Sequence, residues 1–204
     1  MKIGIISGSH RNPSQSEKVA RYLEKSLTSD FADIAPWVFT LADNPLPLWD
    51  QTLWEDNEEW NQRLAPIKQQ LNECDGFIII SPEWHGQVPA GLKNFFLMFN
   101  RFELGHKPAL IVTVSSGDGG AYPVAELRMS SYKNNRLCYI PEQIILRNVE
   151  KILNEEAKDN NPDADIYFRE RIEWALGILR GYAIALKSMR ESTEIHHDKF
   201  SNGM

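Results

Sequence analysis

Short apolar runs rich in branched side chains alternate along this chain with segments of helical periodicity. The runs that predict strands span residues 3–7, 34–41, 77–80, 109–114 and 138–146. Runs that are apolar throughout are typical of strands buried on both faces of a parallel sheet. Strands that alternate with helices predict a single α/β domain with helices on both faces of the sheet. Right-handed crossovers between five such strands favour the doubly wound order 2-1-3-4-5.

Apolar side chains at helical spacing predict the intervening helices. They indicate helices over residues 14–29 and 58–73, one from Pro89, one starting near Val124, and a long one over 172–186. Pro89 is expected at the first-turn position of its helix. The acidic segment 154–165 is expected to be a solvated loop, and the chain is expected to be polar and frayed from Glu191 onward. Residues 1–192 are therefore interpreted as one domain, followed by a polar tail over 193–204.

Size and charge limit the class of protein. A chain of 204 residues fits one large domain. Its net charge of −6 lacks the basic excess of a nucleic-acid-binding protein. No apolar stretch reaches the about 18 residues of a membrane span, and the start of the chain does not resemble a secretory signal. We therefore expect a cytoplasmic protein with no nucleic-acid partner and no membrane insertion, and we interpret its two cysteines as small buried apolar residues.

Three loops follow the first, third and fourth predicted strands, at the edge where a doubly wound sheet binds its ligands. They comprise residues 8–16, 82–88 and 115–120. The first loop combines serine hydroxyls, the guanidinium of Arg11 and the start of a helix, which together favour a bound phosphate. It matches neither the Walker A pattern nor G-x-G-x-x-G. The alternative is a serine-capped helix start beside a solvated arginine.

The second loop resembles a motif of the NADPH-dependent FMN reductase family, within the flavodoxin-like superfamily. That motif reads Pro-Glu-Tyr-Asn-Gly-Ser-Ile-Pro-Gly-x-Leu-Lys-Asn, with Val88 replacing isoleucine here, and it is matched at Pro82, Glu83, Gly86, Pro89, Leu92, Lys93 and Asn94. The family's first-loop pattern Gly-Ser-x-Arg-x-x-Ser is matched at Gly8, Ser9, Arg11 and Ser14. Residues 116–120 resemble its glycine-rich third loop, and residues 45–48 resemble its Leu-Pro-Leu segment. The resemblance spans about residues 3–146.

This resemblance implies a flavodoxin-like three-layer sandwich that binds FMN and oxidises NAD(P)H. The phosphate would lie in the first loop, and the isoalloxazine between the second and third loops. The FMN-binding residues that it implies are Ser9, Arg11, Ser14, Gln15, Ser16, Pro82, Glu83, Trp84, His85, Gly86, Ser116, Gly117, Gly119 and Gly120. Electrons would pass from NAD(P)H through FMN to a small acceptor, such as a quinone, a flavin, an azo or nitro compound, or a metal. Family members are usually homodimers or homotetramers.

Three residues depart from the family motif: Trp84 replaces tyrosine, His85 replaces asparagine and Gln87 replaces serine. Two interpretations of His85 stay open: a ring nitrogen contacts the cofactor or a bound anion, or the residue is a loop histidine bonded to a nearby carbonyl. Two other functions stay open. One is a flavodoxin-like electron carrier or sensor that binds FMN without oxidising NAD(P)H, and the other is a flavin-free α/β binding module.

The remaining candidates are interpreted as structural, and no side chain is assigned as a catalytic residue or metal ligand. Glu83 is expected to cap the turn that follows it. Ser9 and His10 do not suggest a nucleophile pair, because the chain has no G-x-S-x-G elbow. The sequence His-His-Asp at 196–198 is interpreted as solvated tail. Tryptophans flank the proline-rich loop 42–56 as a potential lid or subunit interface, but Trp60, on its helical stripe, is expected to pack in the core.

Overall fold

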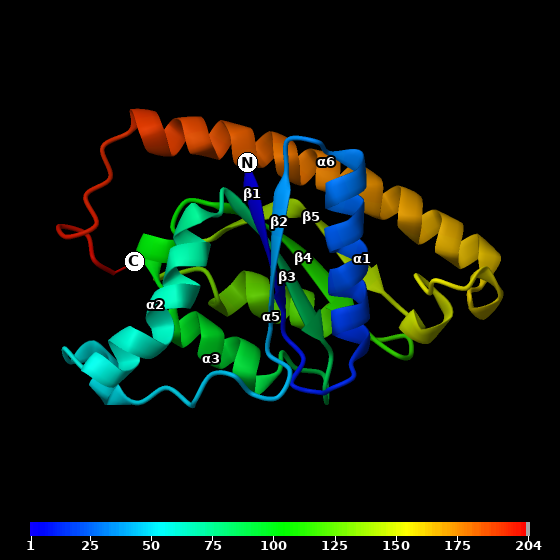
Figure 1. Ribbon diagram of the computed structural model, residues 1–204, viewed down its shortest axis with the longest axis horizontal. Coiled ribbons are helices and arrows are strands. Elements are labelled where there is room, and N and C mark those ends of the chain that lie inside the picture. The colour runs from blue at the N-terminus through cyan, green and yellow to red at the C-terminus, as the bar shows by residue number, and fades with distance from the viewer. Residues whose placement is uncertain (203–204) are drawn as a thin grey trace.

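The computed structural model describes residues 1–202 and contains one sheet of five parallel strands (Figure 1). The strands lie in the predicted order β2-β1-β3-β4-β5. Their bounds are β1 Lys2–Ser7, β2 Ala35–Thr40, β3 Gly76–Pro82, β4 Pro108–Val114 and β5 Cys138–Leu146. The predicted doubly wound, flavodoxin-like architecture is therefore confirmed.

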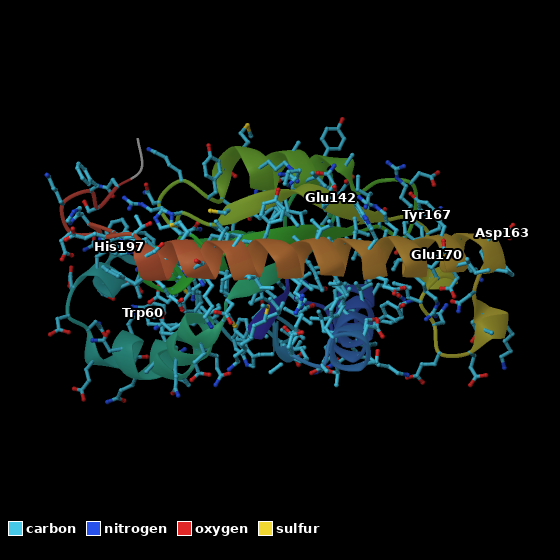
Figure 2. The ribbon with its side chains drawn as sticks, turned by 90° about the horizontal axis from the view of Figure 1, so that it is seen from above. Trp60, Glu142, Asp163, Tyr167, Glu170 and His197 are labelled. Atoms are coloured by element: carbon cyan, nitrogen blue, oxygen red, sulfur yellow. The ribbon has the colours of Figure 1, made fainter. Side chains whose placement is uncertain are left out.

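Helices cover both faces of the sheet and complete three layers. They are α1 Gln15–Asp30, α2 Glu58–Glu73, α3 Ala90–Met98, α4 Arg101–Leu104, α5 Ala121–Ser130 and α6 Pro162–Ser192. Helices α1 and α6 bury their apolar sides in one core, and α2, α3 and α5 bury theirs in a second. Helix α6 runs along the length of the molecule (Figure 2).

The burial of the central strands explains why the sheet could be predicted from the sequence. β3 and β4 are buried along their whole length. Successive side chains of β3 serve opposite cores, with Ile78 and Ile80 in the first and Phe77 and Ile79 in the second. β2 lies at the edge of the sheet, where Pro36 is tolerated because an edge strand does not need every backbone donor.

The segment before α6 differs from the expectation. The prediction of a solvated loop through Asp165 is wrong, because α6 already begins at Pro162 with Asn161 as its N-cap. The Asp165 side chain is buried, where it accepts a hydrogen bond from the Leu153 amide at 2.6 Å and pairs with Arg169 at 2.7 Å. Acidic residues in a first helical turn are favoured by the helix dipole, so a run of charge here marks a helix start.

Smaller differences occur where elements are short. Pro89 is the N-cap of α3 and not a residue of its first turn. α4 and the 3-10 helices Gln51–Trp54, Val149–Lys151 and Ala157–Asp159 are too short to show periodicity. No helix within residues 1–202 combines the length and apolar character needed to cross a membrane.

The end of the chain also differs from the expectation. α6 continues to Ser192, and the interpretation of residues 196–198 as solvated tail is wrong for His197. Its ring lies 5.4 Å from that of Phe102 and 6.1 Å from that of His106. Figure 2 shows His197 at the end of α6 opposite to Asp163. Nearby Arg136 also donates a hydrogen bond to the Phe200 carbonyl.

Candidate functional site

The three predicted loops meet at the carboxyl edge of the sheet and enclose a cavity of about 260 Å³. From the sequence-predicted set it is lined by Ser9, Arg11, Ser14, Gln15, Ser16, Pro82, Glu83, Trp84, Ser116 and Gly117. Val114 and Ser115 also line it and were not predicted, although both end or directly follow a buried strand. His85, Gly86, Gly119 and Gly120 are not among its lining residues.

The first loop ends in a capped helix start. Ser14 is the N-cap of α1, and its Oγ accepts a hydrogen bond from the Glu17 amide at 3.1 Å. Ser9 Oγ accepts from the Arg11 amide at 3.2 Å, which folds the loop back on itself. The first amides of a helix have no partner within the helix. Because Ser14, Gln15 and Ser16 line the cavity, the positive end of α1 forms part of its wall.

The polar groups of this wall suit an anionic, hydroxyl-bearing ligand. Gln15 Oε1 is buried and has no hydrogen-bond partner within residues 1–202. The Arg11 side chain is exposed, and no ion pair holds it in the part of the chain that the structure describes. A free guanidinium and a helix N-terminus favour a phosphate, and an unpartnered amide oxygen accepts from a hydroxyl. A phosphate ester that also carries hydroxyl groups therefore fits the residues present.

The second loop turns back on itself in a tight hairpin. The Trp84 amide donates to the Gln87 carbonyl at 3.2 Å, and the Gln87 amide donates to the Trp84 carbonyl at 3.0 Å. Between them His85 and Gly86 both have positive φ, +51° and +72°. These are the features of a type I′ turn, whose first central position favours asparagine and also admits histidine.

The turn geometry corrects the interpretation of His85. Its side chain is exposed and makes no hydrogen bond within residues 1–202, so it is not a loop histidine bonded to a carbonyl. What the turn requires at this position is a residue that accepts a left-handed backbone. The histidine meets this requirement where the family motif has asparagine.

Glu83 connects the second loop to the third. Its Oε2 accepts a hydrogen bond from the Gly120 amide at 2.6 Å, at the N-cap of α5. The expectation that Glu83 caps the turn after it is therefore wrong. A Cβ on Gly119 would lie 2.8 Å from Glu83 Oε1, and Gly120 has a φ of +103°. These two glycines allow the loops to approach each other.

The segment after β5 holds the third loop in place. The Asn148 amide donates to the Gly117 carbonyl at 3.0 Å, and Asn148 Nδ2 donates to Asp118 Oδ1 at 3.1 Å. The Val149 amide donates to the Ser115 carbonyl at 3.1 Å. Asn148 is a supporting residue that the sequence analysis missed, because nothing in a single chain marks a contact across 30 residues.

The last two residues of the second-loop motif anchor neighbouring segments. Asn94 donates from Nδ2 to the Pro47 carbonyl and accepts from the Trp49 amide, both at 2.8 Å, which holds the proline-rich loop. Lys93 pairs with Glu126 Oε1 at 2.6 Å. Burial opposes ionisation of Glu126, but its hydrogen bonds from Lys93 and the Val88 amide outweigh burial and lower its pKa.

The tryptophans of the proline-rich segment divide between core and surface. Trp60 is buried in the second core, as predicted, and its Nε1 donates to Thr52 Oγ1 at 3.0 Å. The Trp49 and Trp54 rings lie 4.7 Å apart, with Trp54 on the exposed side.

Comparisons with known proteins identify a matching family and similar enzymes. Residues 1–151 match the family described as NADPH-dependent FMN reductase. An NADPH azoreductase from Bacillus sp. (strain OY1-2) is 24% identical over 162 residues, which cover 79% of this chain and 85% of that protein. A quinone reductase from Escherichia coli (strain K12) is 32% identical over 125 residues, covering 59% of this chain and 64% of that protein.

Solved structures share the fold. The flavoenzyme NAD(P)H:(acceptor) oxidoreductase FerB from Paracoccus denitrificans superposes with a TM-score of 0.66. The match covers 92% of this chain and 97% of that one, at 20% identity.

Proposed function

The chain belongs to the NADPH-dependent FMN reductase family, and from this membership we propose that it is an FMN-dependent oxidoreductase that transfers electrons from NAD(P)H to a small acceptor. The observation that carries the proposal is the cavity at the carboxyl edge, where the start of α1 meets a guanidinium and an amide oxygen that have no partner within residues 1–202. When bound, FMN supplies the redox chemistry, and the protein supplies binding and orientation.

We propose that the first loop holds the flavin phosphate. Arg11 would form charge-assisted hydrogen bonds to it, and Ser9, Ser14 and Ser16 would add hydroxyls beside the amides of α1. Gln15 Oε1 is available to accept from a ribityl hydroxyl. The second and third loops would flank the isoalloxazine through Pro82, Glu83, Trp84, His85, Gly86, Ser116, Gly117, Gly119 and Gly120.

The names of similar proteins support a proposal for the class of electron acceptor. Proteins similar to this chain are named for azo and quinone substrates. We propose an acceptor of this class, a small and planar molecule that approaches the flavin ring. Trp84 lines the cavity and offers an aromatic surface where the family motif has tyrosine. We assign no side chain as a catalytic acid or base.

We further propose that residues 1–192 act as one flavin-binding unit, that copies of the chain assemble as homodimers or homotetramers, and that the protein works in the cytoplasm. Exposed apolar side chains on α3 and α5, namely Leu97, Tyr122 and Met129, support an interface. The free thiols of Cys74 and Cys138 fit a reducing compartment.

Measurements of flavin fluorescence and absorbance test the proposal. Purified protein titrated with FMN should quench flavin fluorescence at a defined stoichiometry. Anaerobic addition of NADPH should then bleach the flavin absorbance, and a quinone or azo compound should restore it. Bound flavin that NADPH leaves unchanged would indicate an electron carrier. The absence of FMN binding would contradict the proposed function.

A further inference from the structure

The imidazole of His10 reaches from the first loop to the start of α3. His10 Nε2 accepts a hydrogen bond from the Gly91 amide at 2.9 Å, across 81 positions of sequence. α3 begins after Pro89, which provides no side-chain cap hydrogen bond. The Gly91 amide is among the helix-start donors that lack a partner within the helix. His10 therefore supplies a cap that the local sequence of α3 does not.

Gly91 makes room for this ring. A Cβ built on Gly91 would lie 2.0 Å from His10 Nε2 and 2.6 Å from its Cε1. Glycine is less favourable than alanine within a helix, so its presence in the first turn of α3 needs a reason. The close approach of the His10 ring provides that reason.

The His10 ring also contacts the second loop. It forms a T-shaped pair with the Trp84 indole, with ring centroids 5.6 Å apart and an interplanar angle of 75°. Trp84 lines the cavity, and so do Ser9 and Arg11, the chain neighbours of His10. The imidazole thus joins the first and second of the three loops that line the cavity, although His10 is not itself among the lining residues.

We propose that His10 is a positioning residue for FMN. Its ring would hold the first loop against α3 and Trp84, so that Ser9 and Arg11 are arranged before the cofactor binds. The role requires a neutral ring with its proton on Nδ1, because Nε2 acts as an acceptor. The inference rests on the proposed function and deepens it by assigning a residue outside the cavity lining.

Substitutions of the two partners test the contact through the FMN dissociation constant, measured by quenching of flavin fluorescence. We expect His10→Ala to raise the constant at least fivefold. His10→Gln should stay within about twofold of the native value, since an amide oxygen can accept from the Gly91 amide. Gly91→Ala should displace the ring and weaken FMN binding as much as His10→Ala does.

The double variant distinguishes this coupling from independent damage. Once His10→Ala has removed the ring, adding Gly91→Ala should change the constant by less than twofold, whereas independent effects would multiply. Gly177→Ala is the matched control, because Gly177 lies in α6 and a Cβ there would meet nothing within 4 Å. It should leave FMN affinity unchanged.

The outcomes distinguish failure of the His10 role from failure of the proposed function. The role of His10 would be contradicted if folded His10→Ala bound FMN with native affinity, or if the effects of the two substitutions on the dissociation constant multiplied in the double variant. Neither result would contradict the proposed function. A native chain that does not bind FMN would contradict both this role and the proposed function. Circular dichroism reports folding. If His10→Ala is unfolded, the other two single variants decide. The role is supported if His10→Gln binds FMN with native affinity and Gly91→Ala binds it more weakly. Native FMN affinity in both variants contradicts the role.

Discussion

At the scale of single residues, backbone conformation decides how the motif departures should be understood. His85 replaces asparagine at a position where φ is +51°, and its side chain is exposed. The residue preference of the turn therefore follows from the backbone. A β-branched residue is strongly disfavoured in the left-handed region, whereas asparagine is favoured there.

This difference yields a stability prediction. His85→Val should lower the free energy of unfolding by about 1–2 kcal/mol, and His85→Asn should preserve or raise it. Denaturant titration measures both. Gln87→Val is the control, because Gln87 is also exposed but has no positive φ, and it should have little effect. Equal losses at the two positions would contradict the backbone explanation.

Arg11 gives the corresponding prediction for the ligand. Arg11→Ala should weaken FMN binding about tenfold, the equivalent of about 1.4 kcal/mol, because a charge-assisted contact to the phosphate is lost. Affinity for riboflavin, which lacks the phosphate, should not change. Arg21→Ala on α1 is the control, since Arg21 pairs with Glu17 and Glu24 and is not among the cavity-lining residues. An equal loss of affinity for riboflavin would contradict a contact between Arg11 and the phosphate.

At the scale of elements, a buried lysine joins the start of β4 to the end of α2. Lys107 lies just before β4, and its Nζ donates to the Leu71 and Asn72 carbonyls at 2.8 and 3.0 Å. Burial lowers the pKa of Lys107 to about 8 from 10.5. Burial also raises the pKa of nearby Cys74 to about 12 from 9.0. The two groups therefore affect stability in opposite directions at alkaline pH.

The opposite effects of Lys107 and Cys74 on stability can be separated by experiment. Between pH 8 and 10.5 the unfolded chain keeps the Lys107 proton that the folded chain loses, so this group makes stability rise with pH. Cys74 has the opposite effect between pH 9 and 12, because only the unfolded thiol ionises there. Burial also raises the pKa values of Cys138 and Tyr139, which lowers stability in the same pH range. The contribution of Lys107 is therefore measured as the difference between the Cys74→Ser variant and the same variant with Lys107→Met added. From pH 8 to 10.5 the unfolding free energy of Cys74→Ser should increase by roughly 3 kcal/mol relative to that of the double variant, and an equal pH dependence of the two variants would contradict the assignment.

The start of α6 provides another element-scale prediction. Asp165→Ala should destabilise the protein by about 1–3 kcal/mol, because it leaves the buried Leu153 amide without its acceptor. Asp163→Ala, at an exposed residue of the same turn, is the control and should change stability by less than about 0.5 kcal/mol. Thermal unfolding compares the two. Similar losses would attribute the effect to the helix dipole.

At the scale of the whole molecule, the strand order was predictable because the central strands are buried on both faces and appear as continuous apolar runs. The location of the site then followed from topology, since loops after parallel strands meet at one edge. The contacts that shape the site were not predictable. Glu83 with Gly120, and His10 with Gly91, join residues that the chain separates by 37 and 81 positions. The start of α6 was missed because charge concealed its periodicity.

Ligand binding to this one domain should stabilise the whole molecule. FMN at 100 times its dissociation constant should add about 2.7 kcal/mol and raise the melting temperature by about 5–10 °C. Arg11→Ala at the same FMN concentration should show a smaller increase, and riboflavin should raise both proteins equally. A melting temperature that FMN leaves unchanged would contradict binding to the native state.

The hairpin at residues 84–87 is closed by its own two backbone hydrogen bonds. Its geometry depends on backbone conformation at its two central residues and hardly on the side chains at 84 and 87. The Gln87 side chain is exposed and can therefore be exchanged without rebuilding the scaffold, whereas the Trp84 ring also contacts the His10 ring. The hairpin thus offers protein engineers one compact position, residue 87, for a combinatorial library.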